Sequence, residues 1–112
     1  MIFAQSLGGN LTAPRDGLSE FVSRRGRVKL VRLLLRNGWS TSELARALGI
    51  TRQAIYLWLK REETHPCNPN LAQLVDLALD ADRTGAVRIL RGELETFQKL
   101  LLKKCQVGTL HQ

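Results

Sequence analysis

Two short helical segments joined by a glycine turn constrain this sequence most tightly. Ser40 stands three residues before Glu43, which is the spacing of a capping box. In that motif a hydroxyl and a carboxylate each accept a hydrogen bond from a backbone amide at the start of a helix. The pattern predicts one helix over residues 41–48, a left-handed turn at Gly49 and a second helix over residues 52–61. A pair of short helices joined in this way is typical of a helix-turn-helix.

The apolar residues of this unit predict which faces are buried. Ala45 is small enough to lie where the two helices cross, and Thr51 is a favoured N-cap residue for the second helix. The residues expected to close the shared core are Leu44, Leu48, Ile50, Ile55 and either Trp58 or Leu59. With these turned inward, the residues left for solvent or for a partner are Thr51, Arg52, Gln53, Tyr56, Leu57 and Lys60.

The charge of the chain is uneven along its length. The 112 residues hold 17 Lys and Arg against 10 Asp and Glu, a net charge of +7, and +5 of it falls within residues 1–36. A sequence pI near 10.3 points to a polyanionic partner. The run from Ser23 to Lys29, which contains Arg24, Arg25 and Arg27, suits contacts with phosphates.

Several classes of protein are disfavoured. The longest apolar runs are far shorter than the roughly 18 residues that span a bilayer, so we expect no contact with a membrane interior. The pairs His65 with Cys67, and Cys105 with His111, lack the spacing of a zinc finger, so we expect neither a metal nor a cofactor. So few cysteines indicate a reduced, cytoplasmic protein. A recombinase nucleophile at Tyr56 would need a set of Arg and His that the chain hardly supplies, and we expect no enzyme.

The rest of the chain divides around this unit. We expect an N-terminal flexible arm over residues 1–18, a helix-turn-helix domain over 19–82, a C-terminal helix over 83–106 and a tail over 107–112. Asn68 before Pro69 predicts the start of a further helix. In the C-terminal helix, apolar residues recur at spacings of 3 and 4, the seam of a short coiled coil. These residues are Val87, Leu90, Leu94, Phe97 and Leu101. Such a helix either dimerises or packs back on the domain.

The helix-turn-helix resembles a known family. Residues 38–45 and 49–55, followed by Trp58 and a helix led by proline, are similar to the phage-repressor and Cro type of domain, the XRE family. The residues on the family's framework positions are Ala45, Gly49, Ile55 and Trp58. The resemblance covers about residues 27–90 and implies a compact all-α bundle of four to five helices. Small transposase-associated helix-turn-helix proteins share the pattern Ile-Tyr-x-Trp-x-Lys, so that alternative stays open.

The resemblance implies a dimer that reads a palindromic site on double-stranded DNA. Arg52 and Gln53, with Leu57 one turn later, would occupy the base-reading positions. By its chemistry Tyr56 could contact a thymine methyl group or a phosphate, or it could lie partly buried. Arginine and glutamine suit the edges of guanine and adenine respectively. The residues expected to contact phosphates are Arg24, Arg25, Arg27, Ser40, Ser42, Thr51, Lys60 and Arg61. We expect a transcriptional regulator; the alternative is a DNA-architectural, partition or transposition or recombination accessory protein whose C-terminal helix recruits another protein.

Overall fold

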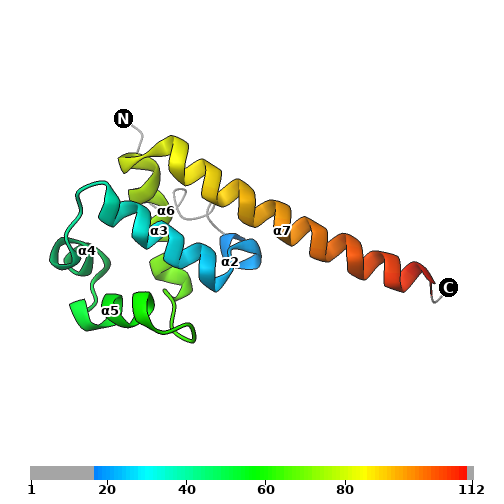
Figure 1. The fold of residues 1–112 in the computed structure, drawn as a ribbon, viewed down its shortest axis with the longest axis horizontal. Coiled ribbons are helices and arrows are strands. Elements are labelled where there is room, and N and C mark those ends of the chain that lie inside the picture. Colours follow the sequence, from blue (N-terminus) through cyan, green and yellow to red (C-terminus); the bar gives the residue numbers. More distant parts are fainter. Residues whose placement is uncertain (1–16, 111–112) are drawn as a thin grey trace.

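A computed structural model describes residues 17–110, and within them every regular element is an α-helix. The helices are α2 (Leu18–Phe21), α3 (Arg24–Arg36), α4 (Thr41–Leu48), α5 (Arg52–Lys60), α6 (Asn68–Ala81) and α7 (Arg83–Leu110). The predicted all-α fold is confirmed: α2 to α6 and the first half of α7 pack as a bundle, and the second half of α7 extends out of it (Figure 1). The predicted arm lies outside the described residues apart from Gly17 and Leu18.

The central helix of the bundle is α3. Ser23 caps it by accepting a hydrogen bond from the Gly26 amide at 3.1 Å, so the helix begins at Arg24. Leu30, Val31 and Leu34 on one face are fully buried and pack against α6 and α7. The opposite face is polar and exposed, because the apolar residues of α3 recur at helical spacing.

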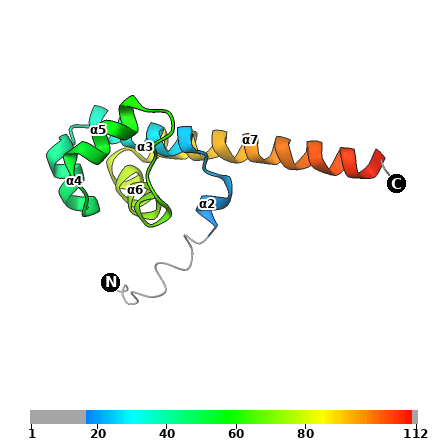
Figure 2. The same ribbon diagram turned by 90° about the horizontal axis from the view of Figure 1, so that it is seen from below.

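The helix-turn-helix, α4 and α5, lies at the end of the bundle from which α7 points away (Figures 1 and 2). The capping box is present, with the Glu43 amide donating to Ser40 Oγ and the Ser40 amide donating to Glu43 Oε1, each at 3.0 Å. Gly49 has φ 70°, in the left-handed region that favours glycine. Thr51 caps α5, since its Oγ1 accepts from the Ala54 amide at 3.1 Å. These predictions are confirmed, although α5 ends at Lys60, one residue earlier than expected.

Buried polar side chains fix the rest of the bundle around this unit. The Arg27 guanidinium donates to the carbonyls of Val22 and Pro66, at 3.2 and 2.9 Å, and to Asn68 Oδ1 at 2.9 Å. Asn68 is thus engaged by α3, and the residue in the N-cap position of α6 is Cys67 rather than Asn68 as predicted. Asn70 Nδ2 donates to the Leu48 carbonyl at 3.3 Å and so ties α6 to the end of α4.

Helix α7 is half packed and half free. It begins at Arg83, after a short break at Asp82, and continues to Leu110, beyond the predicted end at residue 106. Ala86 is fully buried, and Glu93 is 8% exposed with its Oε1 accepting from the Ser23 amide at 2.7 Å. Beyond this contact the helix runs out of the bundle in both views (Figures 1 and 2). Of the two alternatives predicted for the C-terminal helix, packing back on the domain is therefore observed for the first half of α7.

Candidate nucleic-acid interface

The exposed face of α5 carries most of the predicted base-reading residues. Ile55 is fully buried and Trp58 nearly so, and these two side chains fix the rotation of the helix. Arg52, Gln53 and Tyr56 consequently lie in solvent, and 52% of the Tyr56 side chain is exposed. Leu57 is half-buried at the edge of this face. The exposed face can therefore enter a groove of DNA without rearrangement of the core.

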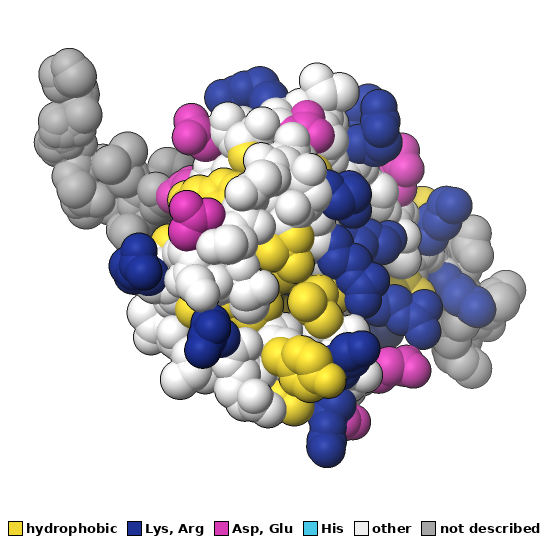
Figure 3. Space-filling view, turned by 60° about the vertical axis from the view of Figure 1, so that its left-hand side comes forward, with side chains coloured by type: hydrophobic (Ala, Val, Ile, Leu, Met, Phe, Trp, Pro, Cys, Tyr) yellow, Lys and Arg dark blue, Asp and Glu magenta, His cyan; other side chains and the backbone are white. Residues whose placement is uncertain are grey.

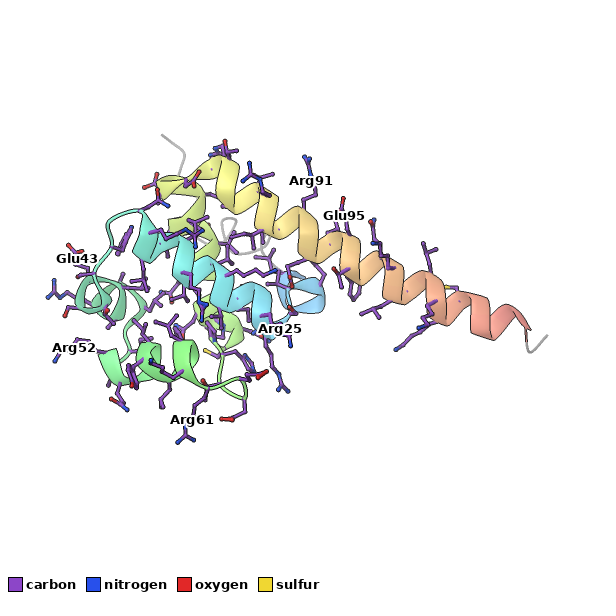
Figure 4. All side chains as sticks on the ribbon, in the orientation of Figure 1. Arg25, Glu43, Arg52, Arg61, Arg91 and Glu95 are labelled. Carbon is purple, nitrogen blue, oxygen red and sulfur yellow. The ribbon has the colours of Figure 1, made fainter. Side chains whose placement is uncertain are left out.

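Both ends of α5 carry cationic residues: Arg52 at the N-terminal end, and Lys60 and Arg61 at the C-terminal end. Lys60 lies with its Nζ 5.6 Å from the centre of the Tyr56 ring, a cation–π distance that joins it to the base-reading face. Arg61 follows at the C-cap and is exposed. Figure 4 shows Arg52 and Arg61 at opposite ends of α5. The two ends can thus contact DNA at different points along the groove.

The predicted hydroxyl contacts lie at the starts of α4 and α5. Ser40, Ser42 and Thr51 are all exposed. Ser40 and Thr51 accept backbone hydrogen bonds as N-caps, and each hydroxyl still has a proton to donate to a phosphate oxygen. The Ser40 amide lowers the pKa of Glu43 from its ordinary value, because its hydrogen bond favours the ionised carboxylate.

The prediction that Arg27 contacts a phosphate is wrong. Arg27 is 6% exposed, and its guanidinium is engaged by three oxygen atoms of the protein. Burial lowers the pKa of Arg27 from its ordinary value, against a smaller opposing effect of Cys67. The sequence places Arg27 in a basic run, but the helical spacing turns this residue toward the core while Arg24 and Arg25 remain exposed.

A groove adjoins the cationic end of α5. It has a volume of about 870 Å³ and lies between α3 and the segment that runs from Trp58 to Thr64. Arg24 and Arg25 line one side, and Lys60 and Arg61 line the other. Four of the predicted phosphate contacts therefore share one concave surface, although they come from distant parts of the sequence.

Three cationic residues that the sequence reasoning did not assign as phosphate contacts, Lys29, Arg32 and Arg36, extend this surface from Arg25 along α3. Arg25, Lys29, Arg32 and Arg36 are spaced by 4, 3 and 4 residues and are all exposed. This spacing places them on one face of the helix, a signal that was present in the sequence. Figure 3 shows Lys and Arg side chains gathered in a band on one side of the visible face, beside a hydrophobic patch.

The predicted dimer seam on α7 is divided by the packing. Leu90 is half-buried against the core of the bundle, so it is not available to a second chain. Leu94 and Leu101 are 40% and 47% exposed, and Phe97 between them is half-buried. Leu100 and Leu102, which the seam did not include, are 57% and 63% exposed. Val87, at the start of the seam, is 37% exposed, and after the half-buried Leu90 the seam is open again from Leu94.

Among the described residues, no cluster of three or more His, Cys, Asp or Glu side chains could hold a metal ion. His111, of the pair formed with Cys105, lies outside these residues. No helix within the described range is long and apolar enough to cross a membrane.

Comparison with known proteins gives one match. No curated protein and no solved structure matches the chain. Residues 22–68 match a family model described as a homeodomain-like domain, and this range takes in α3, α4 and α5. The match supports a DNA-binding helix-turn-helix, without singling out the phage-repressor and Cro type. Over residues 22–68 the chain is similar to homeodomain-like domains.

Proposed function

We propose that this protein binds double-stranded DNA with sequence preference and acts as a dimeric transcriptional regulator. The observation that carries the proposal is the exposed face of α5, the second helix of the helix-turn-helix. Arg52, Gln53 and Tyr56 are exposed in its first two turns. In such units the second helix enters the major groove and its N-terminal residues contact base edges. Arg52 would pair with guanine and Gln53 with adenine.

Affinity would come from contacts on either side of this helix. Lys60 and Arg61 follow α5, and Arg24 and Arg25 face them across the groove. Ser40, Ser42 and Thr51 would add hydroxyl donors at the helix starts. Contacts of these kinds position a protein on the duplex without reading its sequence, and they make binding dependent on salt.

Dimerisation would use the open part of α7. A projecting helix with exposed leucines is only marginally stable in water, and packing against another apolar surface stabilises it. Leu94, Phe97 and Leu101 keep the spacing of a coiled-coil seam. Two copies joined in this way would read a palindrome, with half-sites about 34 Å apart or a multiple of that distance, as the resemblance to phage repressors implies.

Selection of bound duplexes from a random pool tests the base-reading proposal. We expect a palindromic consensus for the wild-type protein. Arg52→Ala should relax one position in each half-site, at a cost of about 1–3 kcal/mol in discrimination for that base pair. Arg91→Ala is the matched control, because Arg91 is exposed on α7 and points away from the other helices (Figure 4). If Arg52→Ala and Arg91→Ala select the same consensus as the wild type, α5 does not read bases as proposed.

The second candidate is a DNA-architectural or accessory protein for partition, transposition or recombination. The same projecting half of α7 favours it, since exposed leucines suit a different protein as well as a second copy. Two results would distinguish this role from the first: no consensus would emerge from the pool, and the free protein would remain a monomer in solution.

A further inference from the structure

We propose that the cationic stripe on α3, formed by Arg25, Lys29, Arg32 and Arg36, is a track for the phosphate backbone of the duplex that α5 reads. This inference rests on the proposed function and extends its contact surface beyond the residues assigned above. It names Lys29, Arg32 and Arg36 as phosphate contacts. It also predicts that the protein covers more of one DNA strand than a single recognition helix would.

The spacing and exposure of the stripe support a linear polyanion as its ligand. At a rise of 1.5 Å per residue, Arg25 and Arg36 are about 16 Å apart along the axis of α3. Each strand of duplex DNA carries one phosphate about every 3.4 Å along the axis of the double helix. All four side chains are exposed, so a phosphate can reach each of them from solvent. Such a stripe repels itself until an anion neutralises it.

The stripe is continuous with the proposed DNA-binding face of α5. Arg25, Lys29 and Arg32 line the groove whose other side is formed by the end of α5. Arg32 Nη2 donates to the Leu59 carbonyl at 3.3 Å, which holds the stripe against the last turn of α5. Lys60 lines the groove and also contacts the Tyr56 ring. A duplex gripped by α5 would therefore run past the stripe without a change in the fold.

The groove also contains two carboxylates and an apolar floor. Glu62 and Glu63 line it beside Arg61, and Val28, Trp58 and Leu59 form apolar parts of its surface. The carboxylates would repel a phosphate, so they confine the backbone to the α3 side of the groove. An acidic protein segment is the other possible occupant. DNA is favoured because the groove opens next to the exposed face of α5.

Paired charge removal tests the track. Lys29→Gln with Arg36→Gln removes two stripe charges that make no side-chain hydrogen bond in the described structure. Arg88→Gln with Arg91→Gln removes two exposed charges of α7 and is the matched control for net charge. Binding to a consensus and to an unrelated duplex is measured over a range of salt concentrations. Each lost phosphate contact should lower the salt slope by about 0.9 and, near 0.1 M salt, weaken binding about eightfold on either duplex.

A second pair of variants tests the same geometry in the opposite direction. Glu62→Gln with Glu63→Gln should tighten binding to both duplexes, an outcome that a folding defect cannot imitate. The track is overturned if the stripe pair binds DNA with the affinity and salt slope of the control pair, while Arg52→Ala still relaxes the consensus. That result would leave the proposed function standing. If the wild-type protein binds no duplex, and instead the stripe pair loses binding to an acidic peptide, both proposals fail.

Discussion

Gly26 lies where α3 is in close contact with the Glu93 side chain of α7. A Cβ atom added to Gly26 would overlap the Glu93 carboxyl group and lie 2.7 Å from Glu93 Cγ. Glycine in a helix costs about 1 kcal/mol relative to alanine, so its presence here is explained by space rather than by propensity. The absence of a side chain allows the carboxylate of α7 to reach the Ser23 amide at the start of α3.

We therefore expect Gly26→Ala to destabilise the protein by about 1–3 kcal/mol, the cost of overpacking a close contact. Gly92→Ala is the matched control, because a Cβ at Gly92 meets nothing within 4 Å. This second variant should stabilise the protein by up to about 1 kcal/mol through helix propensity alone. Urea unfolding measures both free energies. Equal effects of the two substitutions would mean that Glu93 does not require the space at Gly26.

Arg27 shows how burial changes the role of a charged residue. Its guanidinium donates to two carbonyls, one before α3 and one before α6, and to Asn68 Oδ1. Arg27→Met keeps the aliphatic volume but removes all three of these hydrogen bonds. We expect the free energy of unfolding to fall by about 2–3 kcal/mol. The salt slope of DNA binding should stay unchanged for the folded variant. A fall in that slope of about 0.9 would mean that Arg27 contacts a phosphate after all.

At the scale of the element, the start of α4 gives the protein a pH dependence. The Ser40 amide holds the pKa of Glu43 below its ordinary value of 4.5. A depressed pKa in the folded state stabilises the fold above the unfolded pKa, and this contribution is lost as the pH falls through the folded pKa. The capping box should therefore contribute fully at neutral pH and disappear in acid.

Glu43→Gln tests this sign, because glutamine resembles the protonated carboxyl group. We expect the wild type to be more stable than the variant above pH 5, and the two stabilities to converge as the pH falls below 4. Unfolding free energies measured at several pH values give the comparison. A difference that is the same at every pH would show that the charge of Glu43 plays no part in the cap.

At the scale of the whole molecule, α7 makes the shape of the protein asymmetric. The described chain extends 53 Å along its longest axis and 23 Å along its shortest. The bundle occupies one end, and the exposed half of α7 forms the other (Figure 1). A monomer of this shape leaves Leu94, Leu100, Leu101 and Leu102 in water. Association of two copies would cover the leucines that belong to the seam.

We expect sedimentation equilibrium to give about twice the chain mass of 12.6 kDa for the wild type. Leu94→Gln with Leu101→Gln should give the monomer mass with the helical content retained, because both side chains are exposed in the single chain. Leu102→Gln is the control, since Leu102 is more exposed but does not follow the seam spacing. A wild type that is monomeric at micromolar concentration would contradict the proposed dimer.

The sequence predicts the helix-turn-helix well because its signals are local. Ser40, Glu43, Gly49 and Thr51 each act within a few residues, so no knowledge of the tertiary structure was needed. The exposed face of α5 followed from the same reasoning, since the burial of Ile55 fixes the rotation of the helix. The base-reading roles assigned to that face remain predictions.

Features that depend on tertiary contacts could not be obtained in this way. The burial of Arg27 requires the carbonyl of Pro66, which is 39 residues away in the chain. The groove requires α3 to lie beside the residues that follow α5. The division of α7 depends on Glu93 meeting Gly26, and heptad spacing alone does not reveal where packing on the bundle ends. The spacing of residues in the sequence predicts which side chains share a helix face. The elements against which that face packs are known only from the tertiary structure.

The bond between Ser23 and Glu93 also has a consequence for the order in which the protein is made. It joins residues separated by 70 positions. The Ser23 amide, at the start of α3, can therefore bind the Glu93 carboxylate only after the residues between them have been synthesised. Domains tend to fold as units while the ribosome adds about 5–20 residues per second. A nascent chain that ends at residue 68 would contain all of the homeodomain-like match and still lack α6 and α7. The bundle is therefore completed only after α6 and α7 have followed the matched residues out of the ribosome.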